Sequence, residues 1–219
     1  MKRPFIYNPP STPLEIIYID SSIAVLNKPA GLLTVPGKPN EHSDSLYTRL
    51  RKEVFGALLV HRLDLDTSGI IIFARTASSQ VHLNKQFETR RAKKTYVARV
   101  KGHLTETTGR IDFPIIVDWP NRPKQKICFE TGKIATTLYK VLAKEPKDFS
   151  RVELYPITGR SHQLRLHMKS LGHPIVGDPL YADDETFKAS NRLELHSSRL
   201  EITHPKTNKP IVFEVSIPF

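Results

Sequence analysis

One uninterrupted apolar run constrains the fold of this chain more than any other segment. Residues 70–74 read Ile-Ile-Ile-Phe-Ala, with no polar side chain among them. A strand with one wet face alternates apolar and polar residues, whereas a strand covered on both faces is apolar throughout. We therefore predict a buried central strand at residues 70–74.

A short charged loop leads directly into this run. Residues 61–69 read HRLDLDTSG, which places Arg62 and Asp64 just before a Thr-Ser-Gly turn. Loops held by a rigid scaffold often carry catalytic groups. An ionised Asp64 could act as a nucleophile or a general base, and a nearby arginine would lower its pKa. A turn aspartate that only hydrogen-bonds local backbone is the structural alternative.

The same loop offers a metal-binding interpretation. His61, Asp64 and Asp66 supply nitrogen and oxygen ligands of the kind that divalent ions accept. A metal-dependent nuclease would also suit a basic chain. However, no other acidic cluster supplies an obvious further ligand, so metal-free chemistry is favoured and we predict no metal at this site.

The remaining pattern predicts many strands and few helices. We expect strands at residues 15–18, 23–27, 95–100, 136–142 and 151–155, an edge or irregular strand at 111–117, and a hairpin within 200–215. We expect helices at residues 45–54, with Asp44 as N-cap, at 78–89 and at 161–171. This combination indicates an α+β fold with a mixed, largely antiparallel sheet flanked by helices and loops. Nothing marks a linker, so residues 1–219 are predicted to form one domain, with the proline-rich residues 1–13 as an extended arm.

The expected helix at residues 161–171 carries a second group of candidate residues. Leu164, Met168 and Leu171 form a core stripe, and Gly172 follows where a left-handed cap would lie. Arg165 lies off this stripe and needs a carboxylate or phosphate partner if it is buried, with Asp64 as a candidate. His167 fits a satisfied core histidine. A solvated basic helix face is the alternative for the whole segment, including Arg160.

The charge balance points to a polyanionic partner. The chain has 33 Lys+Arg against 22 Asp+Glu, a net charge of +11. Two segments join basic to aromatic residues: RRAKKTYVARV at 90–100, with Lys93, Lys94 and Tyr96, and DWPNRPKQK at 118–126, with Trp119 and Arg122. Such segments suit phosphate contact and base stacking. A strand tyrosine packed in the core and an exposed loop without function are the plainer alternatives.

Other common chemistries lack their sequence signals. There is no Walker-type glycine loop and no GxGxxG after a strand, so no nucleotide or dinucleotide cofactor is expected. The single cysteine, Cys128, cannot form an internal disulfide, which fits a reducing cytoplasm. No apolar run suits a signal region or a membrane helix. We expect a cytoplasmic protein without a membrane anchor.

Taken together, these motifs resemble the RluA family of pseudouridine synthases. The resemblance rests on NKPAG at 27–31, HRLDLDTSG at 61–69, KKTYVARV at 93–100, GRSHQLRLH at 159–167 and GHPIVGDPLYA at 172–182, in family order. It implies the pseudouridine synthase fold around a central RNA-binding cleft and a cofactor-free isomerisation of uridine. It also implies that Asp64 is catalytic, that Tyr96 is the active-site tyrosine, and that Arg165 pairs with the aspartate.

The resemblance narrows the expected substrates. The length of the chain and its residues 118–133 are similar to the member that gives the family its name, which acts on a 23S rRNA hairpin and a tRNA anticodon stem-loop. Arg62 is similar to the family residue that enters the RNA stack and expels the base. The first motif starts near residue 27, so no S4 RNA-binding domain is expected before it, and a monomer is expected. A non-catalytic RNA-binding module is the rival from another class.

Overall fold

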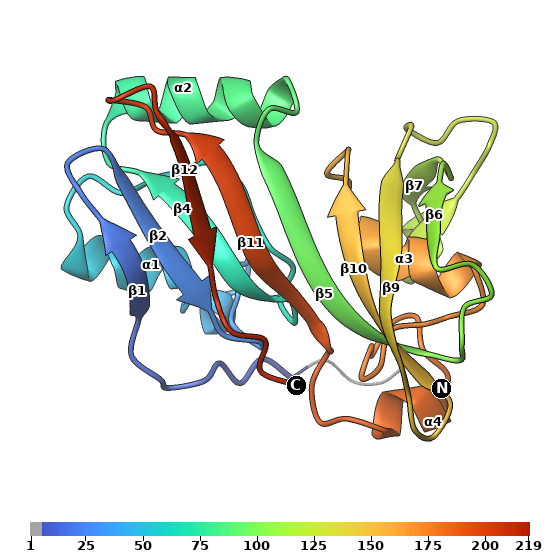
Figure 1. The fold of residues 1–219 in the computed structure, drawn as a ribbon. Coiled ribbons are helices and arrows are strands. Elements are labelled where there is room, and N and C mark those ends of the chain that lie inside the picture. The colour runs from blue at the N-terminus through green and yellow to red at the C-terminus, as the bar shows by residue number, and fades with distance from the viewer. Residues whose placement is uncertain (1–5) are drawn as a thin grey trace. The chain divides into compact units, whose positions relative to one another are not determined.

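The computed structural model describes residues 6–219 and divides into two compact units (Figure 1). The first unit joins the residues before Thr95 to Ser197–Pro218, and the second contains Thr95–His196 and Phe219. Strands and a few helices make up both units, which confirms the predicted α+β class. That the whole chain acts as one domain stays a prediction.

The sheet of the first unit runs in the order β1-β2-β4-β11. Its strands are β1 (Glu15–Ile19), β2 (Ile23–Lys28), β4 (Ser68–Ala74) and β11 (Leu195–Thr203). The short β3 (Leu58–Leu59) pairs with β4, and β12 (Pro210–Glu214) pairs with β11. The predicted strands at 15–18 and 23–27 and the predicted C-terminal hairpin are confirmed.

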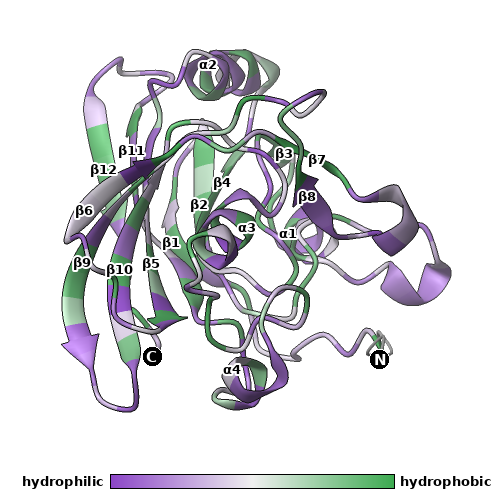
Figure 2. Ribbon diagram, turned by 90° about the vertical axis from the view of Figure 1, so that its right-hand side faces the viewer, coloured by the Kyte–Doolittle hydropathy of each residue, from purple (hydrophilic) through white to green (hydrophobic). Residues whose placement is uncertain are grey.

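Strand β4 is the buried strand that the apolar run predicted. All seven of its residues are buried, and β2 lies antiparallel to it with Ile23 opposite Ala74. Its side chains Ile70 and Ile72 join a core cluster with Leu83 of the helix α2. Strands β2 and β4 accordingly stand out as apolar in Figure 2. The loop before β4 therefore leads into a strand that the core holds in place.

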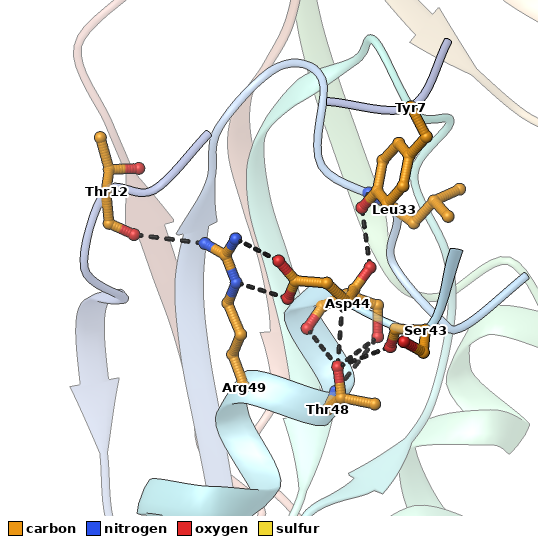
Figure 3. Close-up of polar contacts among 8 residues, drawn as sticks. Tyr7, Thr12, Leu33, Ser43, Asp44, Thr48 and Arg49 are labelled. Atoms are coloured by element: carbon orange, nitrogen blue, oxygen red, sulfur yellow. Dashed lines mark hydrogen bonds and ion pairs between the residues drawn. The ribbon is translucent and has the colours of Figure 1, made fainter. Parts of the chain in front are cut away.

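Two helices flank this sheet, and one predicted cap is wrong. Helix α1 spans Leu46–Glu53 and α2 spans Ala77–Glu88, close to the predictions. The N-cap of α1 is Ser45 and not Asp44, because Ser45 and Thr48 form a reciprocal capping box. Asp44 instead binds the Arg49 guanidinium through two hydrogen bonds of 2.8 and 2.7 Å (Figure 3).

Part of the predicted N-terminal arm can be described. Residues 1–5 lie outside the described residues, and residues 6–13 contain neither helix nor strand, as predicted. The Tyr7 hydroxyl donates to the Asp44 carbonyl at 2.7 Å, and Arg49 donates to the Thr12 carbonyl at 3.3 Å (Figure 3). Hydrogen bonds near each end of residues 6–13 thus hold this segment against the rest of the first unit.

The sheet of the second unit runs in the order β5-β10-β9-β6. Its strands are β5 (Lys93–Lys101), β10 (Phe149–Pro156), β9 (Thr137–Glu145) and β6 (Thr108–Ile111), and their pairings are antiparallel. A separate ladder joins β7 (Ile115–Val117) to β8 (Gln125–Ile127). The predicted irregular strand at 111–117 is therefore divided: β6 ends at Ile111 and β7 begins at Ile115. Pro114 lies in the gap, where its ring leaves the backbone without an N–H donor.

Helix α3 (Gln163–Ser170) lies against β8, β9 and β10, and a short helix α4 covers Asp184–Lys188. All six residues from Gln163 to Met168 are buried, so the alternative of a solvated basic face is wrong for the helix, whereas Arg160 before it is exposed. The helix starts later than predicted because His162 adopts a left-handed conformation with φ 54°. Gly172, with φ +85°, follows the C-terminus as predicted.

Within residues 6–219, none of the helices combines the length and the apolar composition that crossing a membrane requires.

Candidate active site

The Asp64 loop, defined as residues 60–67, connects β3 to β4 and is fixed on both sides of the aspartate. The Leu63 amide donates to the Thr34 hydroxyl at 3.2 Å, and that hydroxyl donates to the Leu63 carbonyl at 2.8 Å. The Leu65 carbonyl accepts from the Gly31 amide at 3.0 Å. Asp64 itself is half-buried between these two anchored neighbours, while Arg62 is exposed. The loop thus presents a carboxylate from a defined backbone.

A buried lysine completes this support and gives the NKPAG motif a structural role. Lys28 has no exposed surface, yet its ammonium donates to the carbonyls of Pro29, Leu32 and Leu65 at 2.9, 2.6 and 2.8 Å. A buried cation is tolerable only where such donors find acceptors. Lys28 therefore ties the NKPAG segment to the residue that follows Asp64. The NKPAG motif is recognisable in the sequence, but the supporting role of Lys28 within it is not.

His61 is set up to accept a hydrogen bond. Burial, and to a lesser degree Lys94, lower the pKa of His61 to about 3, so the ring is neutral at neutral pH. Its Nε2 accepts from the Ile72 amide at 3.2 Å, and the ring stacks on Phe87 with centroids 4.6 Å apart. This nitrogen is occupied by β4, and residues 6–219 contain no group of three or more acidic, histidine or cysteine residues suited to a metal. The geometry gives the metal interpretation no support.

Tyr96 and the basic residues before it lie on β5. Tyr96 is buried to 8% exposure and stands opposite Leu154 of β10. Lys93 is exposed and pairs with Glu201 at 3.2 Å. Lys94 is half-buried, its ammonium lies 5.9 Å from the Phe87 ring centroid, and burial lowers its pKa. Of the two lysines, Lys93 is the more accessible to a phosphate.

Arg165 is buried and is held by the carboxylate of Asp178, a partner that the sequence did not predict. Its guanidinium donates to both oxygens of Asp178 at 2.8 and 2.6 Å, and both side chains are at most 2% exposed. Burial raises the pKa of Asp178, but Arg165 and the amides of Leu180 and Tyr181 outweigh it, so the pKa lies below its ordinary value. In the sequence, Asp178 lies in the GDPLY segment of a matched motif, but nothing there marks it as the partner of Arg165.

Tyr181 links Arg165 to the neighbouring loop. Its ring centroid lies 5.4 Å from the Arg165 guanidinium carbon. Its hydroxyl accepts from the Gln125 amide at 2.8 Å and lies 2.8 Å from His162 Nδ1. The start of β8, the start of α3 and the Arg165–Asp178 pair therefore meet at one tyrosine.

The predicted RNA-contacting residues of the second unit are at its surface. Trp119 lies in a 3₁₀ turn at Trp119–Asn121 and is 68% exposed, with the Arg122 guanidinium 4.5 Å from its ring centroid. Arg160 is exposed as well, and its Nε donates to the Ile134 carbonyl at 3.2 Å. Exposed arginine stacked on an aromatic ring is a common surface for nucleic-acid contact. Their role stays a prediction.

Comparison with protein families identifies the class. Residues 22–170 match the family described as RNA pseudouridylate synthase. Relatives named dual-specificity RNA pseudouridine synthase RluA are 51% identical in Salmonella typhi and in Escherichia coli K12, covering 97% of this chain and 98% of each relative. The chain belongs to the RNA pseudouridylate synthase family, in its RluA branch. It is therefore an isomerase of the pseudouridine synthase type.

Solved structures agree with this assignment. Human RNA pseudouridylate synthase domain containing 1 aligns with a TM-score of 0.78 at 28% identity, covering 100% of this chain and 87% of the human chain. Human RNA pseudouridylate synthase domain containing 4 aligns with a TM-score of 0.75 at 25% identity, covering 93% and 88%. The predicted pseudouridine synthase fold is confirmed.

Proposed function

We propose that this enzyme isomerises specific uridines to pseudouridine in 23S rRNA and in the tRNA anticodon stem-loop. The names of its relatives, which describe dual-specificity RNA enzymes, support a substrate range of more than one RNA. The net charge of +11 favours association with phosphate backbones. The observation that carries the proposal is the half-buried Asp64, whose two neighbours are both fixed through their backbone.

The reaction moves a bond without gaining or losing atoms. The N1–C1′ glycosidic bond of the uridine breaks, the base turns, C5 joins C1′, and the proton at C5 is released while N1 gains one. No redox or group-carrying cofactor is required. The base must first leave its stack, which costs a few kcal/mol and less in a loop than in a duplex. The exposed Arg62 is proposed to fill the vacated space.

Three side chains are proposed to act on the flipped uridine. Asp64 attacks C1′ or removes the C2′ proton, and both routes require the ionised carboxylate. Tyr96 stacks on the uracil and assists loss of the C5 proton. Arg165 is proposed to orient Asp64, and its own guanidinium is held by two hydrogen bonds to Asp178.

The RNA path is proposed to include Trp119, Arg122, Arg160, Lys93 and Lys94. Support comes from the exposure of Trp119, Arg122, Arg160 and Lys93, and from the stacked Trp119–Arg122 pair. The central RNA-binding cleft, a single functional domain, a monomeric state and a cytoplasmic location belong to the same proposal.

The decisive test uses 23S rRNA and anticodon stem-loops as substrates, with and without chelator. The wild-type protein should form pseudouridine in both, and Asp64→Asn should lower the rate at least a thousandfold while the Kd for RNA changes less than threefold. Asp66→Asn is the matched control and should keep most of the activity. Absence of pseudouridine in both RNAs would refute the proposal in favour of an RNA-binding module. Strand cleavage that chelator abolishes would favour the nuclease.

A further inference from the structure

We infer that the N-terminal arm, residues 6–13, is a brace for the Asp64 loop and that Tyr7 is its positioning residue. The inference rests on the proposed catalytic role of Asp64. It assigns to the arm a part in catalysis although the arm supplies no group to the reaction.

Tyr7 holds two backbone groups at once (Figure 3). Its hydroxyl donates to the Asp44 carbonyl at 2.7 Å and accepts from the Leu33 amide at 3.1 Å. Its ring meets that of His42 edge to face, with centroids 5.4 Å apart. The hydroxyl therefore fixes Leu33 relative to the segment just before α1.

The rest of the arm lies along the same part of the unit. A methyl group placed on Gly31 would lie 3.9 Å from the Cδ of Pro10, so Pro10 borders the NKPAG motif. Arg49 donates to the Thr12 carbonyl at 3.3 Å and is itself fixed by Asp44 (Figure 3). Contacts at residues 7, 10 and 12 thus distribute the attachment along the arm.

The residues beside the arm are those that hold the Asp64 loop. The Gly31 amide donates to the Leu65 carbonyl at 3.0 Å, and the Thr34 hydroxyl holds both backbone groups of Leu63. Leu33, which Tyr7 fixes, directly precedes Thr34. Displacing the arm therefore shifts the support of Asp64 from both sides.

This arrangement predicts an effect on the chemical step. Catalysis requires reacting groups held near their productive geometry, and a misplacement of ~1 Å can lower a rate by ~100-fold. Residues 31 and 34 contact backbone beside Asp64, so loosening them changes how often the carboxylate is correctly aimed. The brace should therefore affect kcat more than KM.

The primary test is Tyr7→Phe, which removes the hydroxyl and keeps the ring. We expect amide hydrogen exchange in residues 61–66 to accelerate at least threefold, and kcat to fall about three- to tenfold with KM changed less than twofold. Tyr18→Phe is the matched control, because the Tyr18 hydroxyl bonds Asp20 elsewhere in the first unit. The control should show wild-type exchange in residues 61–66 and wild-type kcat.

A chain without residues 1–13 provides the second variant. It should show faster exchange in residues 61–66 than Tyr7→Phe does, a lower kcat, and little change in exchange of the β4 amides. A merely structural arm would accelerate exchange in β4 and in the loop alike, which would overturn the inference.

The remaining outcomes are equally decisive. Wild-type exchange and kcat in both variants would overturn the brace, and a rise in KM alone would show that the arm contacts RNA instead. Hydrogen exchange is measured on the free protein, so it tests the brace even if the wild-type protein forms no pseudouridine. Failure of the proposed function is thereby distinguishable from failure of the brace.

Discussion

At the scale of single residues, the proposed catalytic carboxylate of Asp64 depends on neighbouring side chains that hold its backbone. Thr34 and Lys28 hold the backbone before and after Asp64. Arg165 is similarly held by Asp178. Each supporting residue is polar and buried, a combination that is costly unless all its hydrogen bonds are formed. A search of the sequence for reactive residue types does not find such supporting residues.

Lys28 offers the clearest test at this scale. Lys28→Met keeps most of the length of the side chain but removes the ammonium donor from three carbonyl oxygens, of which that of Leu65 still accepts from the Gly31 amide. We expect the free energy of unfolding to fall by about 2–4 kcal/mol, measured by urea denaturation.

The exposed Lys38→Met is the control and should change stability by less than about 0.5 kcal/mol. Equal effects of the two substitutions would contradict the supporting role of Lys28.

At the scale of elements, the position of the Asp64 loop depends on the strand β4 that follows it. The expected Thr67-Ser68-Gly69 turn is wrong, because β4 already begins at Ser68 and is buried at every position. Gly69 has φ +108°, and a methyl group there would lie only 2.3 Å from the Ser197 carbonyl oxygen. A glycine is therefore required both by backbone conformation and by the closeness of β11.

Gly69→Ala should consequently be severe. We expect a loss of at least about 3 kcal/mol in the free energy of unfolding, because strain at positive φ adds to a backbone clash. Thermal unfolding of the purified variant measures it.

Gly172→Ala separates the two causes. Gly172 also has positive φ, at +85°, but a methyl group there meets nothing within 4 Å. Its substitution should cost only about 1–2 kcal/mol. Similar losses at both glycines would show that the close approach of Ser197 contributes little.

At the scale of the whole molecule, two histidines with lowered pKa values should make the fold sensitive to acid. Burial, and then Lys94, lower the pKa of His61 to about 3, while burial and then Arg192 lower that of His196 to about 4. In the unfolded chain both rings titrate near their ordinary value, about 6.5. Below that pH the unfolded state binds more protons, so stability falls as pH falls until the folded-state values are reached.

Urea denaturation between pH 7 and pH 4 tests this sensitivity. We expect the free energy of unfolding to fall with pH by up to about 1.4 kcal/mol per unit for each histidine. Asp178 does not contribute to this slope above pH ~4, because its carboxylate is ionised there in the folded and in the unfolded chain. His61→Gln should reduce the slope, and an unchanged slope in that variant would contradict the assignment.

Much of the fold was predictable because its signals are local. The five apolar residues 70–74, the alternation in the C-terminal hairpin and Gly172 after α3 each reflect one element and its immediate environment. The errors arose where local rules compete. Asp44 and Ser45 are both good caps, and the choice of Ser45 depends on Thr48.

The candidate site was predictable only in part. HRLDLDTSG led to the proposal of Asp64 and Arg62, and the resemblance led to that of Tyr96 and Arg165. Asp178 and Lys28 were missed as partners because hydrogen bonds across 13 and 37 residues have no signature in sequence spacing. The burial of Arg165 also escaped prediction, since α3 is covered on more faces than its apolar stripe indicates.

The sequence by itself determined the class of enzyme and the buried strand β4, and it proposed Asp64 as the catalytic carboxylate, because motifs and apolar runs can be read along the chain. Only the tertiary structure decided what holds that carboxylate: Thr34, Gly31 and Lys28 beside the loop, with Tyr7 of the arm behind them. The physical reason is that a buried polar group is stabilised by whichever partner folding brings within hydrogen-bonding distance.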